Sequence, residues 1–284
     1  MFQSDVLKSR TIFITGGGTG LGRSMALRFA ELGANIFLMG RRAEPLAQTV
    51  KEIAAQGGGG RGAYFPGDIR DFAAVENAIV AALGEFGSVD TLVNNAAGNF
   101  IARTEKLSPN AFQAVVGIVL QGTFHCTLAL GRRWIEAKQP GNVLNIVTTY
   151  AAANCGSGFV VPSACAKAGV LAMTRSLAVE WARHRIRLNA IAPGPFPTEG
   201  AFSRLLPSPK LEQQAREQHP MKRFGRHEEL ANLAVFLLSG AAEYINGECV
   251  VIDGGLWLRG AGEFNDFVDL PAGAWAVMEQ ARKK

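Results

Sequence analysis

The chain has 284 residues, 48% of them hydrophobic, which is enough for one large domain or two small ones with a substantial core. A formal net charge of +5 suits anionic small molecules. The sequence has no long Lys/Arg run, which argues against nucleic-acid binding, and no CxxC pair, which argues against a metal site. It also has no secretory signal pattern and no uninterrupted apolar stretch of about 18 residues, which argues against secretion and a membrane span. We therefore expect a cytoplasmic protein.

Apolar runs rich in β-branched residues alternate with helical patterns along the whole chain. In chain order we expect strand 11–15, helix 23–33, strand 35–39, helix 43–53, strand 63–65, helix 72–86, strand 91–94, helix 109–137, strand 143–147, helix 163–181, strand 187–191, helices 210–218 and 228–240, and strand 249–252. This alternation predicts an α/β fold, a doubly wound parallel sheet of about seven strands with helices on both faces. With no linker or internal repeat, residues 1–284 are expected to form a single domain.

A glycine-rich turn follows the first predicted strand and opens the first helix. Gly16, Gly20 and Gly22 permit a tight turn and a close backbone approach to a pyrophosphate at a helix N-terminus. The second strand ends in Gly40-Arg41-Arg42 where an acid would bind a ribose hydroxyl, and arginine accommodates a 2′-phosphate instead. The pattern predicts NADPH as the cofactor. Asp68 could accept from the adenine amino group or cap the next helix.

Three polar residues surround the predicted strand 143–147 and the helix after it. Ser163 and Lys167 are four residues apart and share one helix face, and Tyr150 is expected at the strand end. A hydroxyl, an ammonium and a phenol together could carry chemistry, or could be a capping serine, a solvated lysine and a packed tyrosine. His125, His184, His219 and His227 are scattered, and we expect them to be structural or exposed.

The glycine pattern from Gly16 to Gly22, Asn94-Asn95-Ala96, the residue pair ending at Lys167 and Pro193-Gly194 together resemble the short-chain dehydrogenase/reductase family. The resemblance spans residues 11–255 and implies a homotetrameric Rossmann-type reductase in which Lys167 holds the nicotinamide ribose. It further implies that Asn94 and Asn95 line the adenosine side and tie neighbouring strands together. Together, the residue patterns and the resemblance give the expected cofactor residues: Gly16, Thr19, Gly20, Leu21, Gly22, Arg41, Arg42, Asp68, Ile69, Asn95, Ala96, Lys167, Pro193, Gly194, Pro195, Phe196 and Thr198.

The chain departs from this family at its usual proton donor. Four residues before the lysine the family has tyrosine, and here the residue is Ser163; thirteen residues earlier the family has serine, and here it is Tyr150. Val119 stands where the family has asparagine. Because an aliphatic hydroxyl is a far weaker acid than a phenol, ordinary ketone reduction should be impaired.

Several stretches resemble the 2,4-dienoyl-CoA reductase subgroup: 94–100, 156–164, 193–205 and 262–267. In that reaction charge develops on a thioester oxygen remote from the carbon that accepts hydride, so the site needs aimed hydrogen-bond donors. By this resemblance Tyr150 and Asn99 bind the thioester carbonyl, and Ser163 and Lys167 orient the nicotinamide. The segment 151–162 is about two residues longer than the subgroup pattern. Asn99 could instead bond its own backbone.

An acyl-CoA substrate is expected to meet Phe100, Phe202 and Arg204, of which the last two lie in the family's mobile substrate lid. Three functions remain open on the sequence alone. The first is an NADPH-dependent 2,4-dienoyl-CoA reductase. The second is another short-chain reductase that acts on a ketone, an alcohol or a 3-oxoacyl thioester. The third is a nucleotide-binding module that has lost turnover.

Overall fold

The computed structural model describes residues 2–152, 156–198, 208–260 and 262–282. Seven parallel strands form one sheet in the order β3-β2-β1-β4-β5-β6-β7. The strands are β1 (Thr11–Thr15), β2 (Asn35–Gly40), β3 (Gly62–Pro66), β4 (Thr91–Asn94), β5 (Gly141–Ile146), β6 (Ile186–Pro193) and β7 (Cys249–Ile252). The predicted fold class is confirmed. The strand order reverses direction between β1 and β4, which is where such sheets bind ligands.

Side chains of β1 alternate between two apolar layers. Ile12 and Ile14 belong to one core cluster, and Phe13 belongs to the other and stacks on Phe37. Because the strand is buried on both faces, every residue in it is apolar or a buried threonine. The first layer packs under α1 (Gly20–Glu31), α2 (Ala43–Gln56) and α10 (His227–Leu238), and the second packs under α3 (Phe72–Phe86) and α5 (Gly122–Glu136).

One continuous helical rod runs from Pro109 to Glu136, as the sequence predicts. It consists of α4 (Pro109–Val116), a π-helical turn, η2 (Gly117–Gln121), and α5. The rod is long and apolar enough to cross a membrane by length and composition, yet 56% of its most apolar window is buried in this fold. Its Leu130 and Trp134 lie in the second core layer, so the rod serves here as a core helix.

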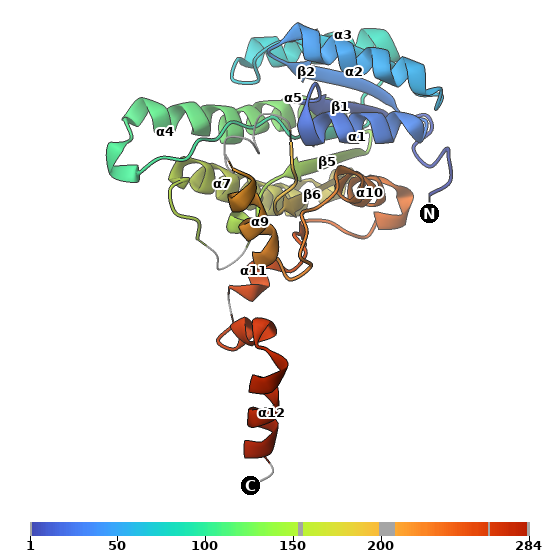
Figure 1. Cartoon of the computed structure of the whole chain (residues 1–284). Helices are drawn as coiled ribbons and strands as arrows, with labels where there is room; N and C mark the ends of the chain where they lie inside the picture. The colour runs from blue at the N-terminus through green and yellow to red at the C-terminus, as the bar shows by residue number, and fades with distance from the viewer. Residues whose placement is uncertain (1, 153–155, 199–207, 261, 283–284) are drawn as a thin grey trace.

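The remaining elements frame the carboxyl end of the sheet and a C-terminal arm. They are η1 (Thr104–Lys106), α6 (Thr149–Ala152), α7 (Val161–Trp181), η3 (Ala182–His184), α9 (Pro209–Gln218), η4 (Gly240–Ala242), α11 (Leu256–Arg259), η5 (Asn265–Asp269) and α12 (Ala272–Ala281). The arm from α11 to α12 projects away from the sheet (Figure 1). Asp269 pairs with both Lys222 and Arg259 at the base of this arm. The sequence analysis did not predict the arm.

Asp71, not Asp68, caps the helix after β3. The Asp71 carboxylate accepts from the backbone N–H groups of Ala73 at 2.9 Å and Ala74 at 3.4 Å. The Asp68 carboxylate is instead paired with the Arg70 guanidinium, so the alternative in which Asp68 caps the helix is wrong.

We therefore expect Asp71→Ala to lower the free energy of unfolding by about 1 kcal/mol, the usual cost of losing an N-cap acceptor. Urea denaturation followed by circular dichroism measures the loss. Asp5→Ala, at an exposed aspartate outside this helix, is the matched control and should leave stability unchanged. Equal stability of the Asp71→Ala variant and the parent would contradict the capping role.

Candidate active site

The glycine-rich turn between β1 and α1 is packed too closely for side chains. A Cβ on Gly22 would lie 2.4 Å from the Gly16 carbonyl oxygen, and one on Gly16 would lie 2.9 Å from the Ala96 Cα. Gly16 and Gly20 also adopt left-handed φ angles of 69° and 55°, which favour glycine. Thr19 is the N-cap residue of α1, and its side chain leaves the helix N–H groups free. The turn thus presents bare backbone donors at a helix N-terminus, the geometry that fits a pyrophosphate.

Two asparagines after β4 hold this turn and the neighbouring strands in place. Asn95 donates from its amide to the Thr15 carbonyl at 3.1 Å and to the Gly16 carbonyl at 3.2 Å. The buried Asn94 donates to Asn145 at 2.8 Å and to Thr127 at 3.0 Å. Both residues therefore tie β4 to its neighbours, as the resemblance implies, but Asn94 is buried and only Asn95 of the two lines the cavity at the adenosine side.

A cavity of about 320 Å³ opens at the carboxyl ends of β1, β2 and β4. Eight of the predicted cofactor residues line it: Gly16, Thr19, Arg41, Arg42, Asp68, Ile69, Asn95 and Ala96. The Arg70 guanidinium and its backbone N–H hold the pKa of the Asp68 carboxyl below its usual range, and the nearby Arg41 adds to this effect. Because Asp68 is engaged by Arg70, the free positive charge at this end of the cavity comes from Arg41 and Arg42.

A second cavity, of about 680 Å³, lies at the opposite end of the sheet. Arg10, Asp90 and Asn142 line it, and each stands just before or at the start of a strand. In open parallel sheets ligands bind beyond the carboxyl ends of the strands, so the smaller cavity is the better candidate for a nucleotide.

Tyr150, Ser163 and Lys167 come together as the sequence predicts, although Tyr150 does not lie at the strand end. Strand β5 ends at Ile146, and Tyr150 follows in the short helix α6. The Tyr150 hydroxyl lies 2.9 Å from the Ser163 Oγ, at the first turn of α7. Lys167 stands one turn further along α7 and donates from its Nζ to the Ile146 carbonyl. The extra length of the segment 151–162 therefore does not displace Tyr150 from Ser163.

Burial lowers the pKa of the Lys167 ammonium to about 8, because only 8% of this residue is exposed. The group is charged below that pH and neutral above it. If Lys167 holds the cofactor ribose, we expect kcat/KM for the cofactor to fall as the pH rises through about 8, since the neutral amine is a weaker donor.

The pH profile of kcat/KM for NADPH measures this effect. In the Lys167→Arg variant the guanidinium stays charged, so whatever activity remains should lose its alkaline limb. A parent profile that stays flat to about pH 10 would exclude a titrating Lys167 from cofactor binding.

The predicted donor Asn99 lies in the exposed segment after β4. Its side-chain oxygen accepts from the Phe100 N–H at 2.9 Å, the local bond that the sequence analysis left open. This bond uses only the carbonyl of the amide, so the NH₂ group remains oriented away from Phe100 and able to donate. The neighbouring Ala102 N–H donates to the Phe159 carbonyl at 2.9 Å and joins this segment to the one before α7. Phe202 and Arg204 lie outside the described residues.

The segment from Pro193 to Thr198 leaves the end of β6 beside the glycine-rich turn. A Cβ on Gly20 would lie 3.2 Å from the Thr198 Cγ2, so this segment passes directly over the start of α1. A Cβ on Gly194 would lie 2.5 Å from the Asp253 Cβ, and Phe196 is buried. Of the predicted residues in this segment, Thr198 therefore lies over the turn, Gly194 lies against Asp253 and Phe196 lies against Gly225, whereas Leu21 packs against the first core layer.

His227 was expected from the sequence to be structural or exposed, and it was given no place in the site. Its Nδ1 lies 2.7 Å from the Ser24 Oγ and its Nε2 lies 2.5 Å from the Pro197 carbonyl oxygen. Both partners are distant in the sequence, and no local motif marks this residue.

Comparisons with known proteins agree with this geometry. The family model described as enoyl-(acyl carrier protein) reductase matches residues 16–257. The chain is 48% identical over 254 residues to a probable (2E)-enoyl-CoA-producing 2,4-dienoyl-CoA reductase of Bacillus subtilis, covering 89% of this chain and 98% of that protein. It is 43% identical over 258 residues to a probable (3E)-enoyl-CoA-producing 2,4-dienoyl-CoA reductase of Caenorhabditis elegans, covering 90% and 82%. A crystal structure of a short chain dehydrogenase from Bacillus anthracis superimposes with a TM-score of 0.79 at 42% identity, over 88% of this chain and 97% of that one.

Proposed function

The chain belongs to the short-chain dehydrogenase/reductase family, and from that premise we propose that it is an NADPH-dependent 2,4-dienoyl-CoA reductase. Membership makes it an oxidoreductase with a nicotinamide cofactor. The observation that carries the narrower proposal is the 2.9 Å contact between the Tyr150 hydroxyl and Ser163 beside the buried Lys167. This contact supports the proposal because it joins a phenol to the helix position four residues before the lysine, which itself holds only a serine.

The described residues suit a phosphorylated dinucleotide. The bare glycine turn would hold the pyrophosphate, and Arg41 and Arg42 would hold the 2′-phosphate at the adenosine end. Lys167 would donate to the nicotinamide ribose, and the segment from Pro193 to Thr198 would cover the nicotinamide end. When bound, NADPH supplies the hydride.

The chain's own groups would act on the thioester oxygen. As hydride reaches the far carbon of the diene, negative charge spreads through the conjugated system to that oxygen. The Tyr150 hydroxyl and the Asn99 amide would donate to it and lower the energy of the dienolate. Ser163 would keep the Tyr150 hydroxyl in position through their mutual hydrogen bond. A proton from solvent then adds to a carbon of the dienolate, so that dienoyl-CoA, NADPH and H⁺ give enoyl-CoA and NADP⁺.

Isotope labelling distinguishes this reaction from carbonyl reduction. When the reaction runs in D₂O with unlabelled NADPH, dienoyl reduction places one solvent deuterium on carbon. Reduction of a ketone places the solvent hydrogen on oxygen, where it exchanges out; a 3-oxoacyl thioester is not used in this comparison, because its acidic C2 hydrogens exchange with D₂O before reduction. Mass spectrometry of the isolated product should therefore show one retained deuterium. A reduced product that retains no deuterium would contradict the dienolate mechanism.

Reduction of a 3-oxoacyl thioester is the second candidate. The observation that favours it is the same Tyr150–Ser163 contact, because it brings the family's phenol and hydroxyl together with their positions exchanged. A phenol that reaches a ketone oxygen in this arrangement could still protonate it. Oxidation of NADPH by 3-oxoacyl-CoA at a rate comparable to that with a dienoyl-CoA would favour this reading.

The assembly and location expected from the sequence stay proposals. The family resemblance supports a homotetramer, and light scattering of the purified protein tests it. A cytoplasmic location also remains a proposal, and some relatives are named as peroxisomal enzymes.

A further inference from the structure

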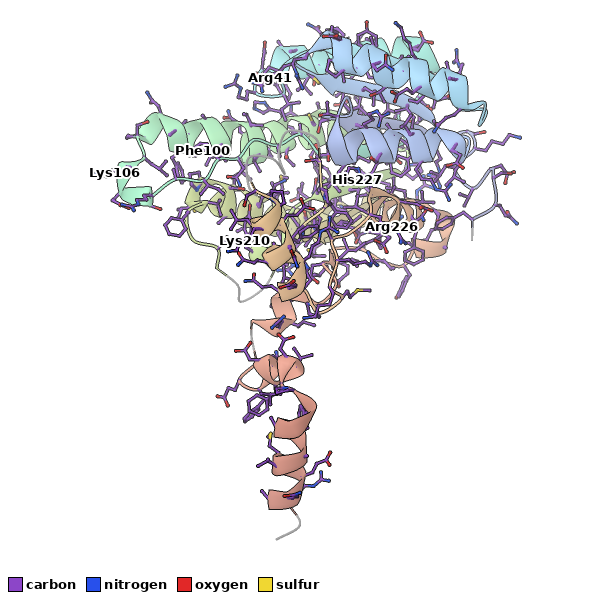
Figure 2. The ribbon with its side chains drawn as sticks, in the orientation of Figure 1. Arg41, Phe100, Lys106, Lys210, Arg226 and His227 are labelled. Carbon is purple, nitrogen blue, oxygen red and sulfur yellow. The ribbon has the colours of Figure 1, made fainter. Side chains whose placement is uncertain are left out.

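His227 joins the helix that begins at the proposed pyrophosphate site to the segment that would cover the nicotinamide. It is the first residue of α10, and Figure 2 labels it. Its Nδ1 lies 2.7 Å from the Oγ of Ser24, and its Nε2 lies 2.5 Å from the carbonyl oxygen of Pro197. Ser24 belongs to the first turns of α1, which begins at the glycine-rich turn, whereas Pro197 belongs to the segment that covers that turn.

Hydrogen-bond chemistry fixes how the ring is used. A backbone carbonyl can only accept, so the Nε2 carries a hydrogen and donates it to Pro197. In the neutral ring the Nδ1 then accepts from the Ser24 hydroxyl. The Ser24 Oγ also lies 3.1 Å from the Gly20 carbonyl, so this one hydroxyl faces both His227 and the turn.

Helix α10, which carries His227, packs closely against α1. Leu230 and Ala234 of α10 lie in the same buried cluster as Met25 and Phe29 of α1. The Arg28 guanidinium of α1 donates to the Asn232 amide oxygen of α10 at 3.0 Å. Helices α1 and α10 therefore form one unit, and His227 attaches the segment 193–198 to it.

We propose that His227 is a positioning residue that holds the segment 193–198 over the glycine-rich turn, so that the nicotinamide and pyrophosphate sites keep a fixed separation. The proposal rests on the cofactor half of the proposed function and not on the identity of the thioester. Because the segment is already held in place before the cofactor binds, binding carries a smaller entropy cost of ordering that segment. The adenosine end of the cavity is lined by Arg41 and Asp68, which follow β2 and β3, and His227 is not part of that lining.

The test compares binding of the whole cofactor with binding of its adenosine half. NADPH and 2′,5′-ADP are titrated into the parent and the His227→Ala variant by calorimetry. The His227→Ala variant loses the two hydrogen bonds to Ser24 and Pro197, so we expect its Kd for NADPH to rise about tenfold. Its Kd for 2′,5′-ADP should stay unchanged. His227→Gln places an amide N–H near the position of the His Nε2, so it can keep the bond to the Pro197 carbonyl and should restore part of the NADPH affinity.

Glu228→Ala is the matched control, because Glu228 is the exposed neighbour in the same first turn of α10. It should bind both ligands as the parent does. Parent-like NADPH affinity in His227→Ala would overturn the proposal. Equal weakening of NADPH and 2′,5′-ADP would also overturn it, since that result means a damaged helix pair and not a displaced nicotinamide segment. Both readouts are independent of which thioester the enzyme reduces.

Discussion

Replacing Tyr150 by Phe is expected to lower turnover on a 2,4-dienoyl-CoA about 10²-fold, the usual cost of removing one oxyanion donor. The phenol would act on charge that develops only during hydride transfer, so its loss should reduce kcat and leave NADPH affinity nearly unchanged. Steady-state kinetics with dienoyl-CoA, together with a titration of NADPH, separates the two effects.

The matched control for this variant is Tyr64→Phe, at an exposed tyrosine on the edge strand β3. It should behave as the parent does in both assays. Parent-like turnover in the Tyr150→Phe variant would mean that another group holds the thioester carbonyl. A large loss of NADPH affinity would instead place the phenol on the cofactor.

Replacing both Arg41 and Arg42 by Ala is expected to weaken NADPH binding by at least about 10- to 100-fold, because the loss of even one hydrogen bond to a charged group costs about 1.5–3 kcal/mol and 1.4 kcal/mol is tenfold. Binding of NADH should change little, since NADH lacks the 2′-phosphate that these guanidinium groups would meet. The ratio of kcat/KM for the two cofactors measures the change in preference.

The control is Arg61→Ala, which removes the same kind of charge at an exposed ion pair with Glu85 on the surface. Its cofactor preference should match that of the parent. If NADPH and NADH weaken equally in the double variant, the arginines shape the cavity and do not select the phosphate.

The sheet was predictable because its strands are buried on both faces. Thr11–Thr15 reads as a continuous apolar and β-branched run, and the observed strand has the same bounds. The short helix α6 was not predictable, because four residues carry no helical period, so Tyr150 was expected at a strand end. The arm helix α12 was missed as well, since its ten residues, AGAWAVMEQA, carry no regular apolar stripe.

Part of the candidate site was likewise predictable from the sequence and part was not. The glycine turn and the Ser163–Lys167 pair depend on short sequence spacing, so the sequence reveals them. Asp68 and Asp71 both precede a helix, and only the observed bonds decide which one caps it. His227 meets Ser24 from 203 residues away, and a contact of that kind leaves no local signal.

The proposal that the enzyme reduces a conjugated thioester is tested most directly by comparing kcat/KM for 2,4-dienoyl-CoA and 3-oxoacyl-CoA substrates of matched chain length with NADPH. With a serine four residues before Lys167, and with a phenol that we propose donates to the thioester oxygen, the dienoyl substrate should be preferred by about 10²-fold or more. Equal rates, or a preference for the 3-oxoacyl substrate, would contradict the account.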